Sequence, residues 1–135
     1  MTTEKDFRGT WTVLRSSFDD AVAKLPEALQ AEGFGVITQI DMQATLKAKI
    51  GVDFRRYRIF GACNPKFAHE ALQGDAHVGL LLPCNVVLYE NDEKKAVLGV
   101  IDPVLQLGAD HDARFAPLAK EIGDRLTRAA AALDA

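Results

Sequence analysis

Hydrophobic and polar positions along the chain switch repeatedly between a two-residue and a helical period, which predicts short alternating strands and helices. Alternation at Thr10–Leu14 and at Phe34–Ile40 predicts two strands, because these stretches are rich in residues that favour extended backbone. Between them, apolar residues recur at helical spacing. Ser16 or Ser17 can cap that helix, and Gly33 is suited to end it.

The middle of the chain continues in the same way. Asp41 can cap a short helix that Gly51 ends, and a strand is predicted at Tyr57–Ala62. Asn64 followed by Pro65 is a strong helix start, with asparagine as N-cap and proline at the first helical position. This helix is expected to run to residue 73 or so, before a Gly-Asp pair.

The last third of the chain predicts extended segments at Val78–Leu82 and Val86–Glu90, a polar hairpin loop at 91–95 and a strand at Ala96–Ile101. Asp102-Pro103 is expected to fix a turn, and a final helix to begin between 112 and 117 and continue to about 133. This order predicts an α+β fold of two layers, with a mostly antiparallel sheet and helices packed on one face. Residues 1–9 are expected to be a flexible segment, and residues 10–135 a single domain.

Composition agrees with one ordinary globular domain. The chain has 135 residues, 48% of them hydrophobic and 26% charged, and a formal net charge of −3. Nucleic-acid binding is not expected, because it usually requires a basic surplus on one face. The one dense basic stretch, Arg55, Arg56 and Arg58, is expected to be a solvated strand edge, with anion binding as the alternative.

The expected location is the cytoplasm. The N-terminus lacks the apolar core of a signal peptide, and the most apolar stretch is far shorter than the ~20 residues of a membrane-spanning helix, so no membrane association is expected. In a reducing compartment the two cysteines should be free thiols.

The candidate site consists of two Cys-Asn pairs, each next to a proline and each at a strand boundary: Cys63 with Asn64, and Cys84 with Asn85. Cys63 precedes a helix N-terminus, which can favour a thiolate and so a nucleophile or a soft ligand. The simpler interpretation is a small packed residue beside a structural cap, and for Cys84 packing within a strand is the stronger interpretation. If the two strands are neighbours, both thiols are expected to line one pocket.

A metal site is weakly indicated, and none is assigned. A structural zinc site needs four ligands, usually in paired short spacings, and neither cysteine has a second cysteine or a histidine at such spacing. Asp110-His111-Asp112 resembles a metal cluster in composition only, because acidic caps are common before a helix. No phosphate-binding glycine loop, nucleophile elbow or metalloprotease helix is present in the sequence, and no cofactor is assigned.

The motifs GACNP, at residues 61–65, and LLPCNV, at 81–86, lie in a longer pattern that begins with GFGVITQIDMQATLKAKIG and ends with VIDP. Over roughly Thr10 to Leu133, this pattern resembles the bacterial and archaeal family of domain of unknown function 302. The resemblance implies a compact α+β fold with an antiparallel sheet and a homodimer. It implies no activity and no catalytic residue.

Two functions are therefore expected as alternatives. The first is a small dimeric binding domain whose pocket, around Cys63, Asn64, Cys84 and Asn85, holds a small-molecule ligand. The second is a thiol-dependent enzyme or sulfur carrier that uses Cys63. The substitution Cys63→Ser separates them, because a binding domain should keep its ligand whereas thiol chemistry should be lost.

Overall fold

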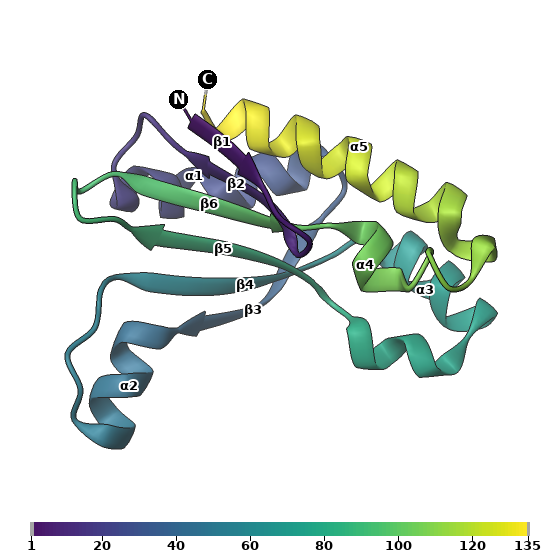
Figure 1. Cartoon of the computed structure of the whole chain (residues 1–135), viewed down its shortest axis with the longest axis horizontal. Coiled ribbons are helices and arrows are strands. Elements are labelled where there is room, and N and C mark those ends of the chain that lie inside the picture. The colour runs from purple at the N-terminus through teal and green to yellow at the C-terminus, as the bar shows by residue number, and fades with distance from the viewer. Residues whose placement is uncertain (1, 135) are drawn as a thin grey trace.

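A computed structural model of the chain describes residues 2–134. Its six strands form one sheet in the order β1-β2-β6-β5-β4-β3, and every neighbouring pair is antiparallel (Figure 1). The strands are β1 (Thr2–Lys5), β2 (Gly9–Val13), β3 (Gly35–Asp41), β4 (Tyr57–Cys63), β5 (Cys84–Glu90) and β6 (Ala96–Ile101). The helices are α1 (Phe18–Ala31), α2 (Met42–Ile50), α3 (Pro65–Gly74), α4 (Pro103–Leu107) and α5 (Ala116–Leu133), with 3₁₀ turns η1 (Ala76–Leu81) and η2 (Ala113–Phe115).

The expected α+β architecture is confirmed. Helices α1 and α5 pack on each other and cover one face of the sheet (Figure 1). Alternation along the strands directs one set of side chains to this layer, and the core forms between them. Its largest fully buried members are Phe18, Phe34, Phe60, Leu14, Leu25, Leu29, Leu88, Leu98, Leu133, Gln106 and Val86.

Local capping explains most helix boundaries. The Ser17 side chain accepts a hydrogen bond from the Asp20 amide, and the Asp41 side chain accepts one from the Ala44 amide. Gly51 ends α2 in the left-handed conformation. Helix α2 buries none of its residues and projects from the end of the β3–β4 pair (Figure 1), so the domain core does not depend on it.

Three segments differ from the sequence predictions. Residues 2–5, placed in a flexible segment, form the edge strand β1, which pairs with β2. The extended segment predicted at Val78–Leu82 is wrong, because Asp75 caps the 3₁₀ turn η1 there and accepts a hydrogen bond from the His77 amide. The Asp102-Pro103 pair starts helix α4 rather than only a turn.

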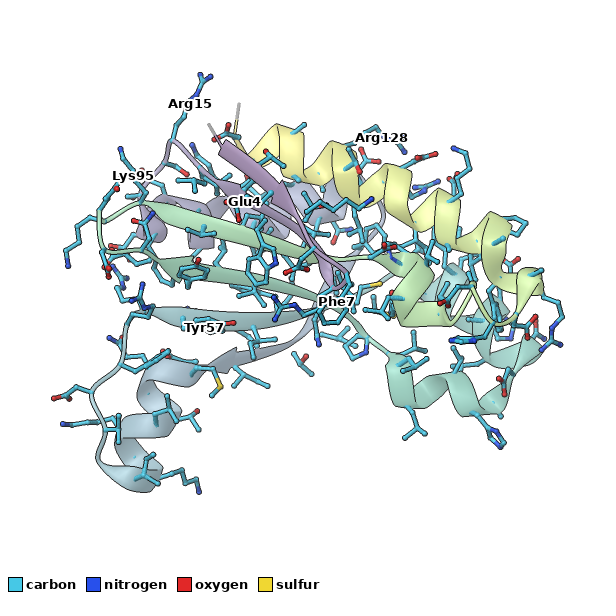
Figure 2. All side chains as sticks on the ribbon, in the orientation of Figure 1. Glu4, Phe7, Arg15, Tyr57, Lys95 and Arg128 are labelled. Carbon is cyan, nitrogen blue, oxygen red and sulfur yellow. The ribbon has the colours of Figure 1, made fainter. Side chains whose placement is uncertain are left out.

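Helices α1 and α5 leave the second face of the sheet uncovered, and an aromatic row crosses that face. Tyr57 stacks on Tyr89 with ring centroids 5.7 Å apart, and Tyr89 meets Trp11 edge-on at 6.2 Å. Glu4 and Tyr57, labelled in Figure 2, both belong to this face by strand register. Within residues 2–134, no helix is long and apolar enough to cross a membrane.

Candidate functional site

A pocket of about 270 Å³ lies where the ends of β4 and β5 meet helices α3, α4 and α5. It contains three of the four site residues that the sequence predicts. Its lining is Phe34, Ile37, Ala62, Cys63, Asn64, Phe67, Ala68, Ala71, Leu72, Leu82, Pro83, Cys84, Gln106, Leu107 and Ile122. Strands β4 and β5 are neighbours, and both Cys63 and Cys84 are among the residues that line this pocket.

Cys63 and Asn64 occupy the junction between β4 and α3. Asn64 is the N-cap of α3, and its side-chain oxygen accepts a hydrogen bond from the Phe67 amide at 3.2 Å. Pro65 follows at the start of the helix, as the Asn-Pro pair predicts. Cys63, directly before the cap, is half-buried and lines the pocket.

Gly33 makes room for the Asn64 cap from the turn that follows α1. Its φ of +87° lies in the left-handed region, and a Cβ there would be 2.9 Å from the Asn64 side-chain nitrogen. The turn that ends α1 therefore needs glycine for its backbone conformation and for the close approach of Asn64. Sequence reasoning assigned this glycine only the first of these roles.

Of the two cysteines, Cys84 is the buried one. In the β4–β5 register it lies opposite Ala62, with its side chain toward the helix layer and only 6% of its surface exposed. Burial raises the pKa of the Cys84 thiol from 9.0 to about 11, which a hydrogen bond to Gln106 partly offsets and the nearby Cys63 reinforces. Cys84 is therefore a neutral thiol near pH 7 and is not a nucleophile there.

Gln106 is the site residue that the sequence analysis missed. It lies in α4, lines the pocket and is only 2% exposed, and it is the one polar residue in the buried core of residues 2–134. Its Oε1 accepts a hydrogen bond from Cys84 Sγ at 3.1 Å. Its Nε2, also buried, has no hydrogen-bond partner among the described residues.

An unpaired buried amide nitrogen is uncommon, because losing its hydrogen bonds to water costs about 1–3 kcal/mol. The Asp-Pro start of α4 was the sequence signal that could have placed Gln106 on a helix. Nothing in the sequence indicates that the side chain would be buried beside Cys84.

Asn85 does not join the other three site residues. Because side chains alternate along a strand, it points to the opposite face of the sheet from Cys84 and is exposed. There it lines a separate shallow hollow with Arg8, Trp11 and Leu105. The second Cys-Asn pair is thus divided between the two faces of the sheet.

The other charged candidates are solvated and paired. Arg55 bonds Asp92 at 3.1 Å, Arg56 bonds Asp19, and Arg58 lies 3.8 Å from Asp41. The three arginines therefore form ion pairs at the sheet margin, where each is worth little. Within the described part of the chain, no three His, Cys, Asp or Glu side chains lie together where they could hold a metal ion.

Comparisons with known proteins agree with this fold. The family model of the domain of unknown function DUF302 matches residues 10–133. The chain is also similar to a solved structure, the crystal structure of an uncharacterized conserved DUF302 protein from Bacillus stearothermophilus. The two are 30% identical with a TM-score of 0.76, over 92% of this chain and 94% of that one. No curated protein matches the chain.

Proposed function

The chain belongs to the DUF302 family, and we propose that it is a binding domain whose ligand occupies the pocket between β4, β5 and helices α3, α4 and α5. The observation that carries this proposal is the pocket itself, which is almost entirely apolar and lies beside both cysteines, with Gln106, the one polar residue of the buried core of residues 2–134, in its lining.

The pocket has the features of a small-molecule site. Such sites are concave and mostly apolar, with a few polar groups that fix the orientation of the ligand. Here the apolar wall comes from both layers of the fold, and the polar groups are Gln106, Asn64 and the two thiols. The exposed Ile37 and Leu72 also line the pocket, so its mouth is open to solvent.

A test is to fill the pocket without touching its polar groups. Ala68, half-buried on α3, lines the pocket, so Ala68→Phe should place a ring inside it. The matched control is His69→Phe on the exposed side of the same helix. Fragments should be screened by ¹⁵N-HSQC spectroscopy. We expect hits that shift amides of α3 and α4 in the wild type and the control, and not in Ala68→Phe. Hits that bind all three proteins equally, or no hits at all, would contradict a ligand site here.

The second candidate, thiol chemistry at Cys63, is favoured by one observation. Cys63 is the half-buried thiol of the pocket, whereas Cys84 is buried and protonated. A ligand in the pocket would therefore lie beside Cys63. Cys63→Ser decides between the candidates: a binding domain retains its ligand, and a thiol-dependent enzyme or sulfur carrier loses its activity.

We further propose that the domain is a homodimer in the cytoplasm. Among residues 2–134, β1 and β3 are the outer strands of the sheet, so each has an unpaired edge that a second copy could cover. Strand β3 is largely exposed along its length, including Ile37 and Ile40. Light scattering at micromolar concentration should give the mass of a dimer, and a monomer mass throughout the range would remove this proposal.

A further inference from the structure

A second cavity, larger than the pocket beside Cys63, lies between the β1–β2 hairpin and helix α5 (Figure 1). Its volume is about 380 Å³, within the ~300–1,000 Å³ usual for small-molecule sites. Its walls come from β1 and β2, from the end of β6 with Asp102 and Pro103, and from α5. Of the described residues, none lines both cavities, so this one is a separate site.

The cavity exists because both of its walls carry short side chains. On the helix-facing side of the sheet, Leu88 and Leu98 lie opposite each other on β5 and β6, and both are buried. The next position in this row, opposite Leu98 on β2, is Thr12. The α5 wall is also made mostly of small residues: Gly123, Leu126, Thr127, Ala130 and Ala131. Protein interiors are normally filled to close packing, so these two walls leave a space that the chain itself does not fill.

Two opposite charges, Lys5 and Asp102, line this cavity without meeting each other. Lys5 lies opposite Thr10, and Thr10 lies opposite Val100. Asp102 follows Val100 by two residues and points to the same face, so strand spacing and rise place the Cα atoms of Lys5 and Asp102 about 12 Å apart. A ligand between them therefore meets an ammonium group at one end and a carboxylate at the other.

Both charges are available to a ligand. Neither Lys5 nor Asp102 forms an ion pair with another residue in the described range 2–134. Asp102 caps α4 through Oδ1, which accepts a hydrogen bond from the Val104 amide at 2.8 Å, and its Oδ2 remains free. The strand wall between the two charges adds the hydroxyl groups of Thr3, Thr10 and Thr12.

We infer that this cavity binds a free amino acid with an apolar side chain, its carboxylate on Lys5 and its ammonium on Asp102. A zwitterion satisfies both charges, whereas a simple anion would be repelled by Asp102 and a simple cation by Lys5. Val100, Ile101 and Leu126 supply apolar contacts for the ligand side chain. This site goes beyond the proposed function, because it is a different cavity with a different kind of ligand.

The test uses three ligands of one skeleton and two charge-removing variants. L-leucine has both charges, N-acetyl-L-leucine keeps only the carboxylate, and L-leucinamide keeps only the ammonium. Dissociation constants are measured by ¹⁵N-HSQC titration for the wild type, Lys5→Gln and Asp102→Asn, in which asparagine can still cap α4. The matched control is Lys49→Gln on α2, an exposed lysine outside the cavity.

We expect leucine to shift amides of β1, β2 and α5 and to bind more tightly than either derivative. Its affinity should fall about fivefold in Lys5→Gln and in Asp102→Asn, as for the loss of one partly exposed ion pair, and should not change in Lys49→Gln. N-acetyl-leucine should lose affinity only in Lys5→Gln, and leucinamide only in Asp102→Asn. A variant that is merely destabilised would not produce this crossed pattern.

The inference fails if leucine at millimolar concentration shifts no amide of β1, β2 or α5, or if both derivatives bind the wild type as tightly as leucine does. It also fails if each variant weakens all three ligands equally. Shifts confined to α3 and α4 would place leucine in the pocket beside Cys63, which would support the proposed function and overturn this second site.

Discussion

Replacing Gln106 by methionine should stabilise the ligand-free protein. Gln106 is 2% exposed, and its Nε2 has no partner among residues 2–134, so the folded state bears the cost of a buried donor without a hydrogen bond. Methionine has nearly the same length and volume, and its thioether has no N–H to satisfy. The substitution thus removes the cost while it keeps the packing of α4.

The magnitude follows from two opposing effects. Removing the unpaired donor should gain about 1–3 kcal/mol, and losing the hydrogen bond from Cys84 Sγ to Oε1 should cost about 0.5–1 kcal/mol because a thiol is a weak donor. The expected net gain is about 1 kcal/mol in the free energy of unfolding. For a domain of 135 residues this raises Tm by about 3–4 °C.

Equilibrium urea unfolding of ligand-free protein measures this change, with the m-value as a check that both proteins expose the same surface on unfolding. Cys84→Ala is the matched control. It should destabilise the protein, because it leaves Oε1 of Gln106 unpaired as well and removes a buried sulfur. A loss of more than about 1 kcal/mol in Gln106→Met would refute the reasoning, because it would mean that Nε2 has a partner in the free protein.

Three further predictions concern the sheet and the cysteines. Gly99→Ala should cost about 1–3 kcal/mol in urea unfolding, because a Cβ there would collide with the Trp11 ring, whereas Gly35→Ala, where a Cβ meets nothing within 4 Å, should cost much less. Iodoacetamide at pH 7.5 should alkylate Cys63 much faster than Cys84 in the folded protein, and mass spectrometry measures the two rates. Faster labelling of Cys84 would overturn our placement of the accessible thiol. Stability should fall as pH rises from about 9 to about 11, because the unfolded thiol of Cys84 loses its proton before the folded one does, and this part of the pH dependence should be absent in Cys84→Ala.

Capping residues predict the helix boundaries of this chain more reliably than any other sequence signal. The Asn64-Pro65 pair predicted helix α3, and the structure confirms it. The same logic applied to Asp102-Pro103 predicts α4, with Gly108 as its left-handed end, but that segment was interpreted as a turn. Helix α4 carries Gln106, so the missed helix was also the missed site residue.

The strand prediction at Val78–Leu82 is wrong for a different reason. An apolar run without a period does not distinguish a strand from other structure. In the structure Val78 is buried while Leu80 is 91% exposed, so the run lies across the surface as a 3₁₀ turn instead of entering the sheet. Only the packing of the whole domain decides this.

The pocket itself was predictable only in part. The two Cys-Asn pairs predicted a pocket, and in the structure Cys63, Asn64 and Cys84 line one cavity at the ends of the neighbouring strands β4 and β5. Strand alternation places Asn85 on the opposite face of the sheet from Cys84, so the sequence prediction of one pocket for all four residues is wrong for Asn85. The contact of Gln106 with Cys84 joins residues 22 positions apart and depends on how α4 packs under the sheet, which no local pattern encodes.

The central claim is that the pocket beside Cys63 and Cys84 holds a small-molecule ligand. A crystal structure of the protein soaked with acetophenone tests it most directly. The account predicts electron density for the aromatic ring among the apolar side chains of the pocket. An empty pocket in a crystal whose pocket mouth is open to solvent would contradict the account.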